Sequence, residues 1–286
     1  MESSTNINKE QSNDNVVYYY FSHSAFGTYQ TCQRKYFYKY IVGLSGEQPY
    51  VQALDFGTTI HEMIEEALAQ PFDDRVEYID NLVVNKIEEI ADDPLRQYEE
   101  KLLNIRDKLP HVIPKYDIHD SGIERYIYTD MFDVEELEQE QVQTFLNALG
   151  RKGKKIDGCF MGVRIGGYVD GFLEEKETNK NTVIDWKTGK YYTKPEWIEK
   201  YLKQIQLYSY ILRDMGEQVD AGKLVYVEQL KEHEVDVSQE KCEEVFNNHK
   251  QTALDIMNKG EHIYEFNMSQ DERECMQCEY AMVCKL

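Results

Sequence analysis

The sequence has no long apolar run. A membrane-spanning helix needs about 18 consecutive apolar residues, and every apolar stretch of this chain is far shorter. Its first 15 residues are polar and lack the apolar segment of a secretory signal. We therefore expect a cytoplasmic protein that makes no membrane contact, with residues 1–15 as a disordered tail. The 41% of hydrophobic residues in a chain of 286 suffices for a substantial core, in one large domain or two small ones.

Basic residues are scarce, since 32 Lys and Arg stand against 53 Asp and Glu, for a net charge of −21. A protein that covers long stretches of nucleic acid needs many cations, so this balance argues against that class. The acidity is concentrated, because residues 62–140 alone carry a net −15 and leave −6 for the rest of the chain. The sequence also lacks a Gly-x4-Gly-Lys-[Ser/Thr] loop, which excludes an ATP-driven helicase motor.

Cysteine is sparse as well. Six cysteines are too few for a disulfide scaffold, and clustered cysteines in a reducing compartment more often bind metal. Cys275, Cys278 and Cys284 fall within ten residues, and Cys32 is the best candidate for a fourth ligand. Four thiolates suit either a zinc ion or an iron–sulfur cluster, and the spacing leaves that choice open. The other two cysteines are expected to be buried apolar thiols.

Apolar periodicity divides the chain into elements. Helical spacing predicts a helix over residues 22–41, capped by Ser22 or Ser24, and a second helix after Gly57 with an apolar stripe. Residues 72–150 are acidic and mostly helical, with a strand near 126–128. From residue 160 onward a period of two predicts strands at 160–165, 168–174, 182–187, 223–228 and 233–237, and Gly166 and Gly167 are interpreted as a turn. One further helix is expected after Pro195, and another over residues 238–258.

This order of elements predicts an α/β protein with a central mixed sheet and helices on both of its faces. The expected organisation is a disordered tail (1–15), N-terminal helices (16–71), an inserted acidic helical subdomain (72–150), an α/β core (151–260) and a C-terminal segment (261–286).

Polar residues gather on two of the predicted strands, in Gly-x2-Asp, which ends at Asp170, and in Asp-x-Lys-Thr-Gly, which contains Asp185 and Lys187. Strand alternation points Asp185 and Lys187 to the same face, and an antiparallel neighbour would bring Asp170 to a strand spacing of about 4.8 Å. Two carboxylates so close repel each other unless a cation lies between them, and a hard divalent ion suits oxygen ligands. The alternative interpretation is a solvent-facing Asp/Lys ladder on an exposed sheet.

Two helices carry further candidates. His61 lies beside the apolar stripe of its helix, and Glu65 shares its side one turn later. Gln204 and Tyr208 are one turn apart beside the buried face of their helix, where they can reach a phosphate or orient Lys187. Taken singly, each of these residues is more readily explained by a structural role than by a functional one.

Together these residues resemble the PD-(D/E)XK nuclease superfamily, and within it the RecB/AddB-type nuclease domain of the iron–sulfur branch that includes the CRISPR-adaptation exonucleases. The resemblance covers residues 20–286 in the right order, with 72–150 matching only as a variable helical insertion. Gln33 departs from the family pattern, in which Pro often follows the first Cys. The motifs in chain order are Ser-x-Ser with Cys32, Gly-x3-His (His61), Gly-x2-Asp (Asp170), Asp-x-Lys-Thr-Gly (Asp185, Lys187), Gln-x3-Tyr (Gln204, Tyr208) and Cys-x2-Cys-x5-Cys (Cys275, Cys278, Cys284).

The resemblance implies a metal-dependent deoxyribonuclease with a restriction-endonuclease-like core. Mg²⁺ or Mn²⁺ would be held by His61, Asp170, Asp185 and the backbone carbonyl of Trp186. Lys187 would activate or position the attacking water, and Gln204 and Tyr208 would support Lys187 and the DNA backbone. A [4Fe–4S] cluster, with Zn²⁺ as the alternative, would staple the chain through Cys32, Cys275, Cys278 and Cys284.

The resemblance implies an exonuclease with a helicase, a recombination factor or a CRISPR-adaptation factor as partner. The few cations near this site lead us to expect that it acts on single-stranded or frayed DNA ends. A catalytically silent DNA-binding or assembly module of the same fold is the alternative, and a zinc-stapled protein unrelated to nucleases is a third interpretation. The expected DNA-binding residues are Lys152, Lys154, Lys155, Lys190 and Lys194.

Overall fold

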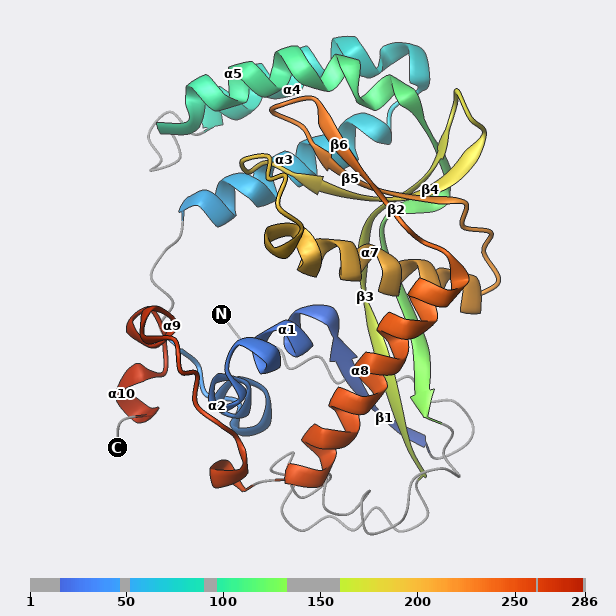
Figure 1. The fold of residues 1–286 in the computed structure, drawn as a ribbon. Helices are drawn as coiled ribbons and strands as arrows, with labels where there is room; N and C mark the ends of the chain where they lie inside the picture. The colour runs from blue at the N-terminus through green and yellow to red at the C-terminus, as the bar shows by residue number, and fades with distance from the viewer. Residues whose placement is uncertain (1–15, 47–51, 90–96, 133–159, 261, 285–286) are drawn as a thin grey trace. The chain divides into compact units, whose positions relative to one another are not determined.

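A computed structural model describes residues 16–46, 52–89, 97–132, 160–260 and 262–284 (Figure 1). The chain splits into two compact units. Unit 1 comprises Met1–Pro49, Tyr128–Gly167 and Phe246–Leu286, and unit 2 comprises Tyr50–Ile127 and Tyr168–Val245. Within the described part of the chain, no helix has both the length and the apolar character needed to cross a membrane.

The strands hydrogen-bond in the order β1-β3-β4-β5-β6, and β2 also pairs with β3. The pairings β1–β3 and β4–β5 are parallel, whereas β3–β4 and β5–β6 are antiparallel. The mixed sheet and its flanking helices confirm the predicted α/β fold class. The strands are β1 (Val16–Ser22), β2 (Tyr116–Phe132), β3 (Phe160–Glu175), β4 (Lys180–Lys187), β5 (Ala221–Tyr226) and β6 (Lys231–Val235).

Helices cover both faces of the sheet in unit 2 (Figure 1). On one face lie α3 (Gln52–Leu68), α4 (Arg75–Glu89) and α5 (Glu99–Lys108). Ile60 and Ile64 of α3 pack there with Ile184 and Trp186 of β4 in one apolar core, each of them at most 1% exposed. Complete burial of each such side chain contributes about 1.5–3 kcal/mol. The apolar stripe predicted from the sequence is therefore the contact that orients α3.

Helix α7 (Pro195–Asp214) covers the opposite face. Its approach to β5 depends on Gly222, because a Cβ atom at that position would lie 2.7 Å from Ile205 of α7 and 2.6 Å from Val237. The missing side chain lets the helix lie close to the sheet. This closeness brings the polar residues of α7 to the side chains of β4.

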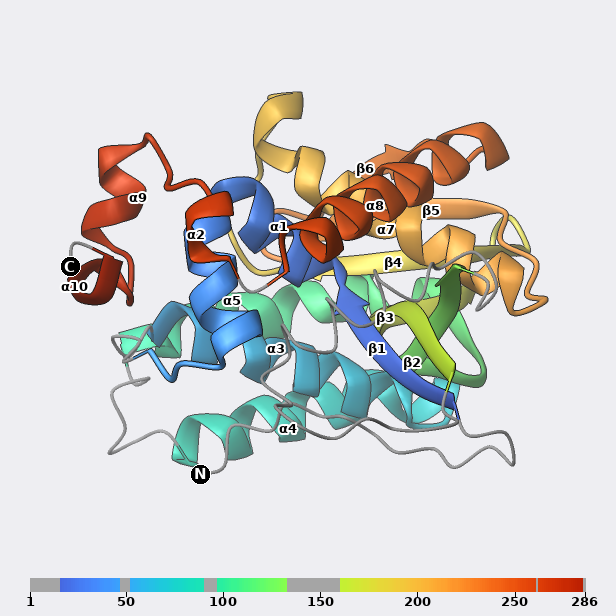
Figure 2. The same ribbon diagram turned by 90° about the horizontal axis from the view of Figure 1, so that it is seen from below.

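Unit 1 contains β1, α1 (His23–Thr31), α2 (Gln33–Tyr36), the part of α8 (Gln239–Lys259) from Phe246 onward, α9 (Glu272–Met276) and α10 (Ala281–Cys284). The Ser22 hydroxyl accepts a hydrogen bond from Ala25 N, as expected of an N-cap. The prediction of a single helix over residues 22–41 is wrong in one respect. The backbone is extended at Cys32, so α1 ends there and α2 begins after it. The π-helical turn η1 (Phe37–Val42) follows α2. Arg34 N of α2 donates a hydrogen bond to the carbonyl oxygen of Asn267, so the segment before α9 runs beside α2 (Figure 2).

Four further predictions of elements need correction. Gly166 and Gly167 do not form a turn, since β3 runs through them and Gly166 pairs with Ser22 of β1. Strand β1 was not predicted, and β2 is a strand of 17 residues inside the segment expected to be mostly helical. Helix α3 begins at Gln52, before Gly57.

Candidate active site

The pairing of β3 with β4 brings the two predicted motifs together. Gly171 lies opposite Ile184, so continuing the register by one residue places Asp170 opposite Asp185. A hydrogen bond from Trp186 N to Asp170 Oδ2, 3.1 Å long, supports this arrangement. Because Ile184 and Trp186 face the core beneath α3, strand alternation turns Asp185 and Lys187 toward α7.

Asp185 and Lys187 form a buried ion pair with 2.6 Å between Lys187 Nζ and Asp185 Oδ2. Asp185 is 4% exposed, and among the described residues this oxygen has no partner besides Lys187. Burial raises the pKa of Asp185 to about 6; Lys187 opposes the rise and Asp170 adds to it. Burial opposes the charge on Lys187, yet Asp185 and Asp170 hold the Lys187 pKa above its ordinary value. The ammonium group thus stays charged at neutral pH.

His61 of α3 lies at the same end of the strands. Its Nε2 is 3.0 Å from the carbonyl oxygen of Trp186, which can only accept, so Nε2 carries the proton. Burial, followed by the charge of Lys187, lowers the pKa of His61, which favours the neutral ring. The Nδ1 lone pair then faces Asp170 Oδ2 at 3.5 Å. Two electron-rich atoms facing each other at this distance favour a cation between them.

A third member of this group was missed in the sequence. Glu124 of β2, His61 and Asp170 each offer a ligand atom, and these atoms lie within 4.8 Å of one another. Burial, and then the charges of Asp170 and Glu65, raise the pKa of Glu124 to about 7. Its φ of 45° is uncommon for a residue with a side chain, and such strain often marks functional positions. No sequence signal distinguishes Glu124 from the other acidic residues of 62–140.

Helix α7 contributes Gln204 and Tyr208. Their side chains are hydrogen-bonded to each other, and burial raises the pKa of Tyr208, with added effects of Asp170, Asp185 and Glu124. The predicted residues of unit 2 thus converge on one end of β3 and β4. Asp185 was expected to be a metal ligand together with His61 and Asp170. In the structure it pairs with Lys187 instead and is not part of the three-residue group of His61, Glu124 and Asp170.

These donors fit a hard divalent cation. Carboxylate oxygens and a neutral imidazole are ligands of Mg²⁺ and Mn²⁺. Burial raises the pKa values of Glu124, Asp170 and Asp185, and Lys187 opposes this rise at Asp170 and Asp185. The lone pair of His61 directed at Asp170 and the second carboxylate of Asp170 beside buried Asp185 are the two local features that a cation would satisfy.

Unit 1 holds the second candidate site. Cys32, Cys275, Cys278 and Cys284 all line one cavity of about 200 Å³. Burial raises the pKa of Cys284; Arg34 opposes the rise, and the other three cysteines add to it, which places all four within electrostatic reach. Four cysteines around one cavity suit a zinc ion or an iron–sulfur cluster. Cys242 lies outside this cavity and is buried beside Arg213 of α7.

The predicted DNA-binding lysines fall in two places. Lys190 and Lys194 are exposed residues between β4 and α7. Lys152, Lys154 and Lys155 lie outside the described residues.

Comparison with known proteins gives a result at the level of the family. A search among curated proteins found no match. The family model of the PD-(D/E)XK nuclease superfamily matches residues 20–285. This range includes every residue of the His61, Glu124 and Asp170 group, the Asp185–Lys187 pair and the four cysteines of the cavity. The chain therefore belongs to the PD-(D/E)XK nuclease superfamily.

Proposed function

We propose that the protein is a metal-dependent nuclease that hydrolyses DNA phosphodiester bonds, and that it acts as an exonuclease on single-stranded or frayed ends. The observation that carries this proposal is the convergence of His61, Glu124 and Asp170 beside the buried Asp185–Lys187 pair. We also propose that the domain is of the RecB/AddB type and belongs to the iron–sulfur branch, which the four-cysteine cavity supports.

Each residue has a distinct role in this proposal. His61, Glu124 and Asp170 would hold Mg²⁺ or Mn²⁺, with Asp185 and the Trp186 carbonyl as further ligands. A bound ion supplies positive charge to the phosphate and a more acidic water. Lys187 stays protonated, so it donates hydrogen bonds to the attacking water and the phosphate rather than removing a proton. Gln204 and Tyr208 limit the freedom of Lys187 and face the DNA backbone.

The test uses an end-labelled single strand, a blunt duplex and a closed circle, each with Mg²⁺ and with Mn²⁺. We expect cleavage of the single strand with both ions, and Mn²⁺ at least as effective because it accepts an imidazole ligand more readily. Asp170→Asn and Asp185→Asn should lower the rate by at least about a hundredfold. Glu177→Gln, an exposed carboxylate in the β3–β4 hairpin, is the control and should be as active as the wild type.

Three results would contradict the proposal. Equal rates for the wild type and both Asp variants would mean that the activity is a contaminant. Rapid cleavage of the closed circle would replace the exonuclease with an endonuclease. DNA binding without cleavage under any metal condition would favour a catalytically silent DNA-binding module.

The second part of the proposal is that Cys32, Cys275, Cys278 and Cys284 bind a [4Fe–4S] cluster with a structural role. Cys32 and Cys275 are 243 positions apart in the sequence, so a cross-link between them closes a very long loop. By analogy with a disulfide, closing such a loop stabilises the folded state by about 5 kcal/mol. The cluster would tie α2 to the end of the chain.

Anaerobically purified protein tests the cluster. We expect a brown colour with an absorbance maximum at about 400 nm. Cys32→Ser should remove the iron and lower the midpoint of unfolding, whereas Cys242→Ser, the matched buried cysteine, should keep the colour. Stoichiometric zinc without iron would establish the zinc alternative, and an unchanged iron content in Cys32→Ser would exclude Cys32 as a ligand.

A further inference from the structure

One face of α7 carries a stripe of four aromatic or amide residues, Trp197, Tyr201, Gln204 and Tyr208. Their spacing of four, three and four residues keeps them on one side of the helix. The inner end, Tyr208, is buried, and the charges of Asp170, Asp185 and Glu124 act on its hydroxyl. The outer end, Trp197, is 52% exposed. The stripe therefore leads from the candidate metal site to the surface.

The outer end is an exposed aromatic group with a lysine against it. The Trp197 ring meets the Tyr192 ring edge-on at 5.1 Å between centroids, and Lys194 Nζ lies 4.9 Å from the Trp197 centroid. Tyr192 fixes the position of Trp197, while about half of the Trp197 surface stays open to solvent. An indole held in this way offers a flat surface for stacking, and the neighbouring ammonium group offers a partner for a phosphate.

The middle of the stripe connects this aromatic pair to the proposed chemistry. Lys187 Nζ lies 4.4 Å from the centroid of Tyr201, and Lys200 Nζ lies 4.7 Å from the same centroid. Tyr201 is thus shared between the lysine of the Asp185–Lys187 pair and a lysine nearer the surface. The distance from Trp197 to Tyr208 along the helix is about 16 Å, which matches several stacked nucleotides at about 3.4 Å each.

The segment that carries the aromatic stripe is also positively charged. Residues 187–203 contain five lysines and two glutamates, a net +3 in a chain of −21. The described cations of this segment accompany the aromatic stripe, so the surface combines the two features by which single strands are bound without sequence preference. A blunt duplex offers its phosphates but not its base faces, because these are already stacked.

We propose that Trp197, Tyr192 and Tyr201 form a stacking track for an unpaired nucleic acid strand, which enters at Trp197 and leads to the metal site. The proposal rests on the nuclease function and deepens it, because the track makes an unpaired end the preferred substrate. Trp197 and Tyr192 hold a base at the entrance, Lys194 and Lys200 contact phosphates, and Tyr201 delivers the strand to Lys187.

Binding without cleavage tests the track. The protein has two tryptophans, and Trp186 is 1% exposed, so quenching of tryptophan fluorescence by an added oligonucleotide reports on Trp197. A 12-nucleotide single strand and a blunt duplex of equal length are titrated in EDTA against the wild type, Trp197→Ala and Trp197→Phe. We expect Trp197→Ala to weaken single-strand binding, measured by anisotropy, about 5- to 100-fold, as stacking on one base predicts. Duplex binding should change less than about twofold, and Trp197→Phe should retain most of the affinity.

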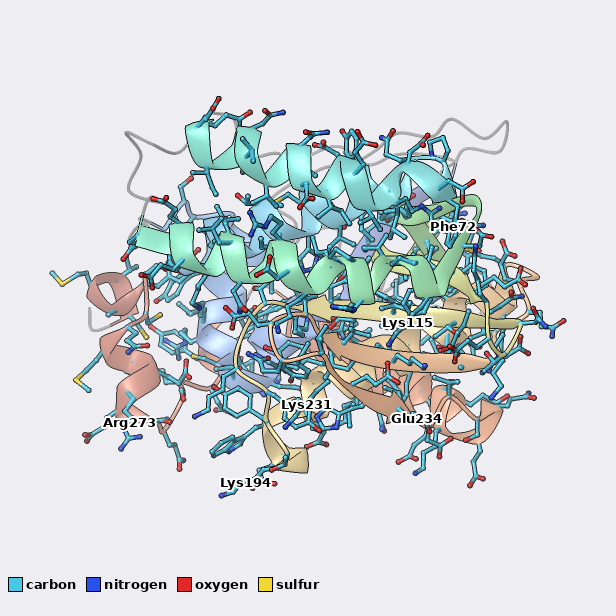
Figure 3. The ribbon with its side chains drawn as sticks, turned by 90° about the horizontal axis from the view of Figure 1, so that it is seen from above. Phe72, Lys115, Lys194, Lys231, Glu234 and Arg273 are labelled. Atoms are coloured by element: carbon cyan, nitrogen blue, oxygen red, sulfur yellow. The ribbon has the colours of Figure 1, made fainter. Side chains whose placement is uncertain are left out.

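The matched control is Phe72→Ala. Phe72 is a 40% exposed aromatic residue of unit 2 with Lys176 Nζ 3.1 Å from its ring centroid, so it has the same chemistry as Trp197 with Lys194. Figure 3 shows Phe72 and Lys194 far apart. Single-strand affinity should be unchanged in Phe72→Ala. An equal loss in Phe72→Ala and Trp197→Ala would mean that exposed aromatics in general, and not the track, contribute to binding.

Failure of the track and failure of the nuclease function give different results. Unchanged single-strand affinity in Trp197→Ala overturns the track, and metal-dependent cleavage by the same preparation would leave the nuclease function intact. If Trp197→Ala loses single-strand affinity and the wild type cleaves no substrate, the stacking track is supported and the nuclease function is contradicted. Equal losses of affinity for the single strand and the duplex would show that the segment is an electrostatic contact without stacking.

Discussion

Two buried lysine–carboxylate pairs in unit 2 have the same separation but opposite electrostatic behaviour. Lys187 lies 2.6 Å from Asp185, and Lys223 of β5 lies 2.6 Å from Glu175 at the end of β3. Burial raises the pKa of Asp185 to about 6 despite its lysine. For Glu175, burial also acts to raise the pKa, but hydrogen bonds from Lys223 and Thr178 outweigh it and lower the pKa.

The neighbours of the two pairs explain the difference. Glu175 accepts hydrogen bonds from Lys223 and from the Thr178 hydroxyl, so both of its oxygens have partners. Asp185 has a single charged partner, Lys187, at its Oδ2, and the second carboxylate of Asp170 raises its pKa further. Lys223 also contacts Glu232 at 3.4 Å, but the side chain of that second carboxylate is 40% exposed to solvent. The side chain of Asp170, the second carboxylate beside the Asp185–Lys187 pair, is only 15% exposed, so the excess negative charge there is the more buried one. Such excess charge is what a cation site requires, so distance alone does not separate a structural pair from a functional one.

Removing the lysine of each pair should give the largest contrast. Lys187→Met should lower the rate of single-strand cleavage by at least about a hundredfold, because it removes a charge already in place for the transition state. Lys223→Met should leave the rate per folded molecule within about threefold, since its partner is Glu175. Single-turnover rates with Mn²⁺ measure both. Equal losses in the two variants would mean that Lys187 acts through stability alone.

Replacing the carboxylate of each pair should have the opposite effect on stability, with the larger loss at the Glu175–Lys223 pair. Glu175→Gln should lower the free energy of unfolding by about 2 kcal/mol, because a hydrogen-bonded charge partner of Lys223 is lost. Asp185→Asn should cost far less, since the folded state disfavours the ionised form of Asp185. Urea denaturation of metal-free protein at pH 7 provides the comparison. A larger loss for Asp185→Asn than for Glu175→Gln would refute our assignment of excess charge to the Asp185 pair.

Metal binding should depend on Glu124 and not on its acidic surroundings. Glu124→Gln should weaken Mn²⁺ binding at least about tenfold, because it removes one of the three groups that converge in unit 2. Glu62→Gln, an exposed residue next to His61, is the control and should bind as the wild type does. Isothermal titration with Mn²⁺ measures both affinities. Similar weakening in the two variants would indicate a diffuse effect of negative charge.

The contribution of Glu175 to stability should fade in acid. The pKa of Glu175 is lower in the folded than in the unfolded state, so its stabilisation is complete above the unfolded pKa and is lost as the pH falls through the folded pKa. The difference in unfolding free energy between the wild type and Glu175→Gln should therefore begin to shrink below the unfolded pKa of about 4.3 and be lost once the pH lies below the folded pKa. Denaturation curves at several pH values check this. A difference that stays constant with pH would mean that packing, not charge, is lost in Glu175→Gln.

Local patterns predicted much of this fold. The alternation of residues 182–187 predicted β4, and the apolar stripe Ile60 and Ile64 predicted the buried face of α3. The turn expected at Gly166 and Gly167 is absent because neighbouring strands hydrogen-bond the chain through that point, and the bonds to β1 outweigh the local preference of glycine. The same dependence on neighbours concealed β1, since a strand is stable only when another strand pairs with it.

By itself the sequence determined which residues have the chemistry for a cation and for a thiolate-bound group, because carboxylate, imidazole and cysteine side chains have fixed donor properties and their motifs occur in a fixed order. Only the tertiary structure decided which of them meet. Glu124 joins His61 and Asp170 because β2 pairs with β3, and Asp185 turns to Lys187 because both lie on the face of β4 that α7 covers. Contacts between residues far apart in the sequence depend on strand pairing and packing, which no local spacing encodes.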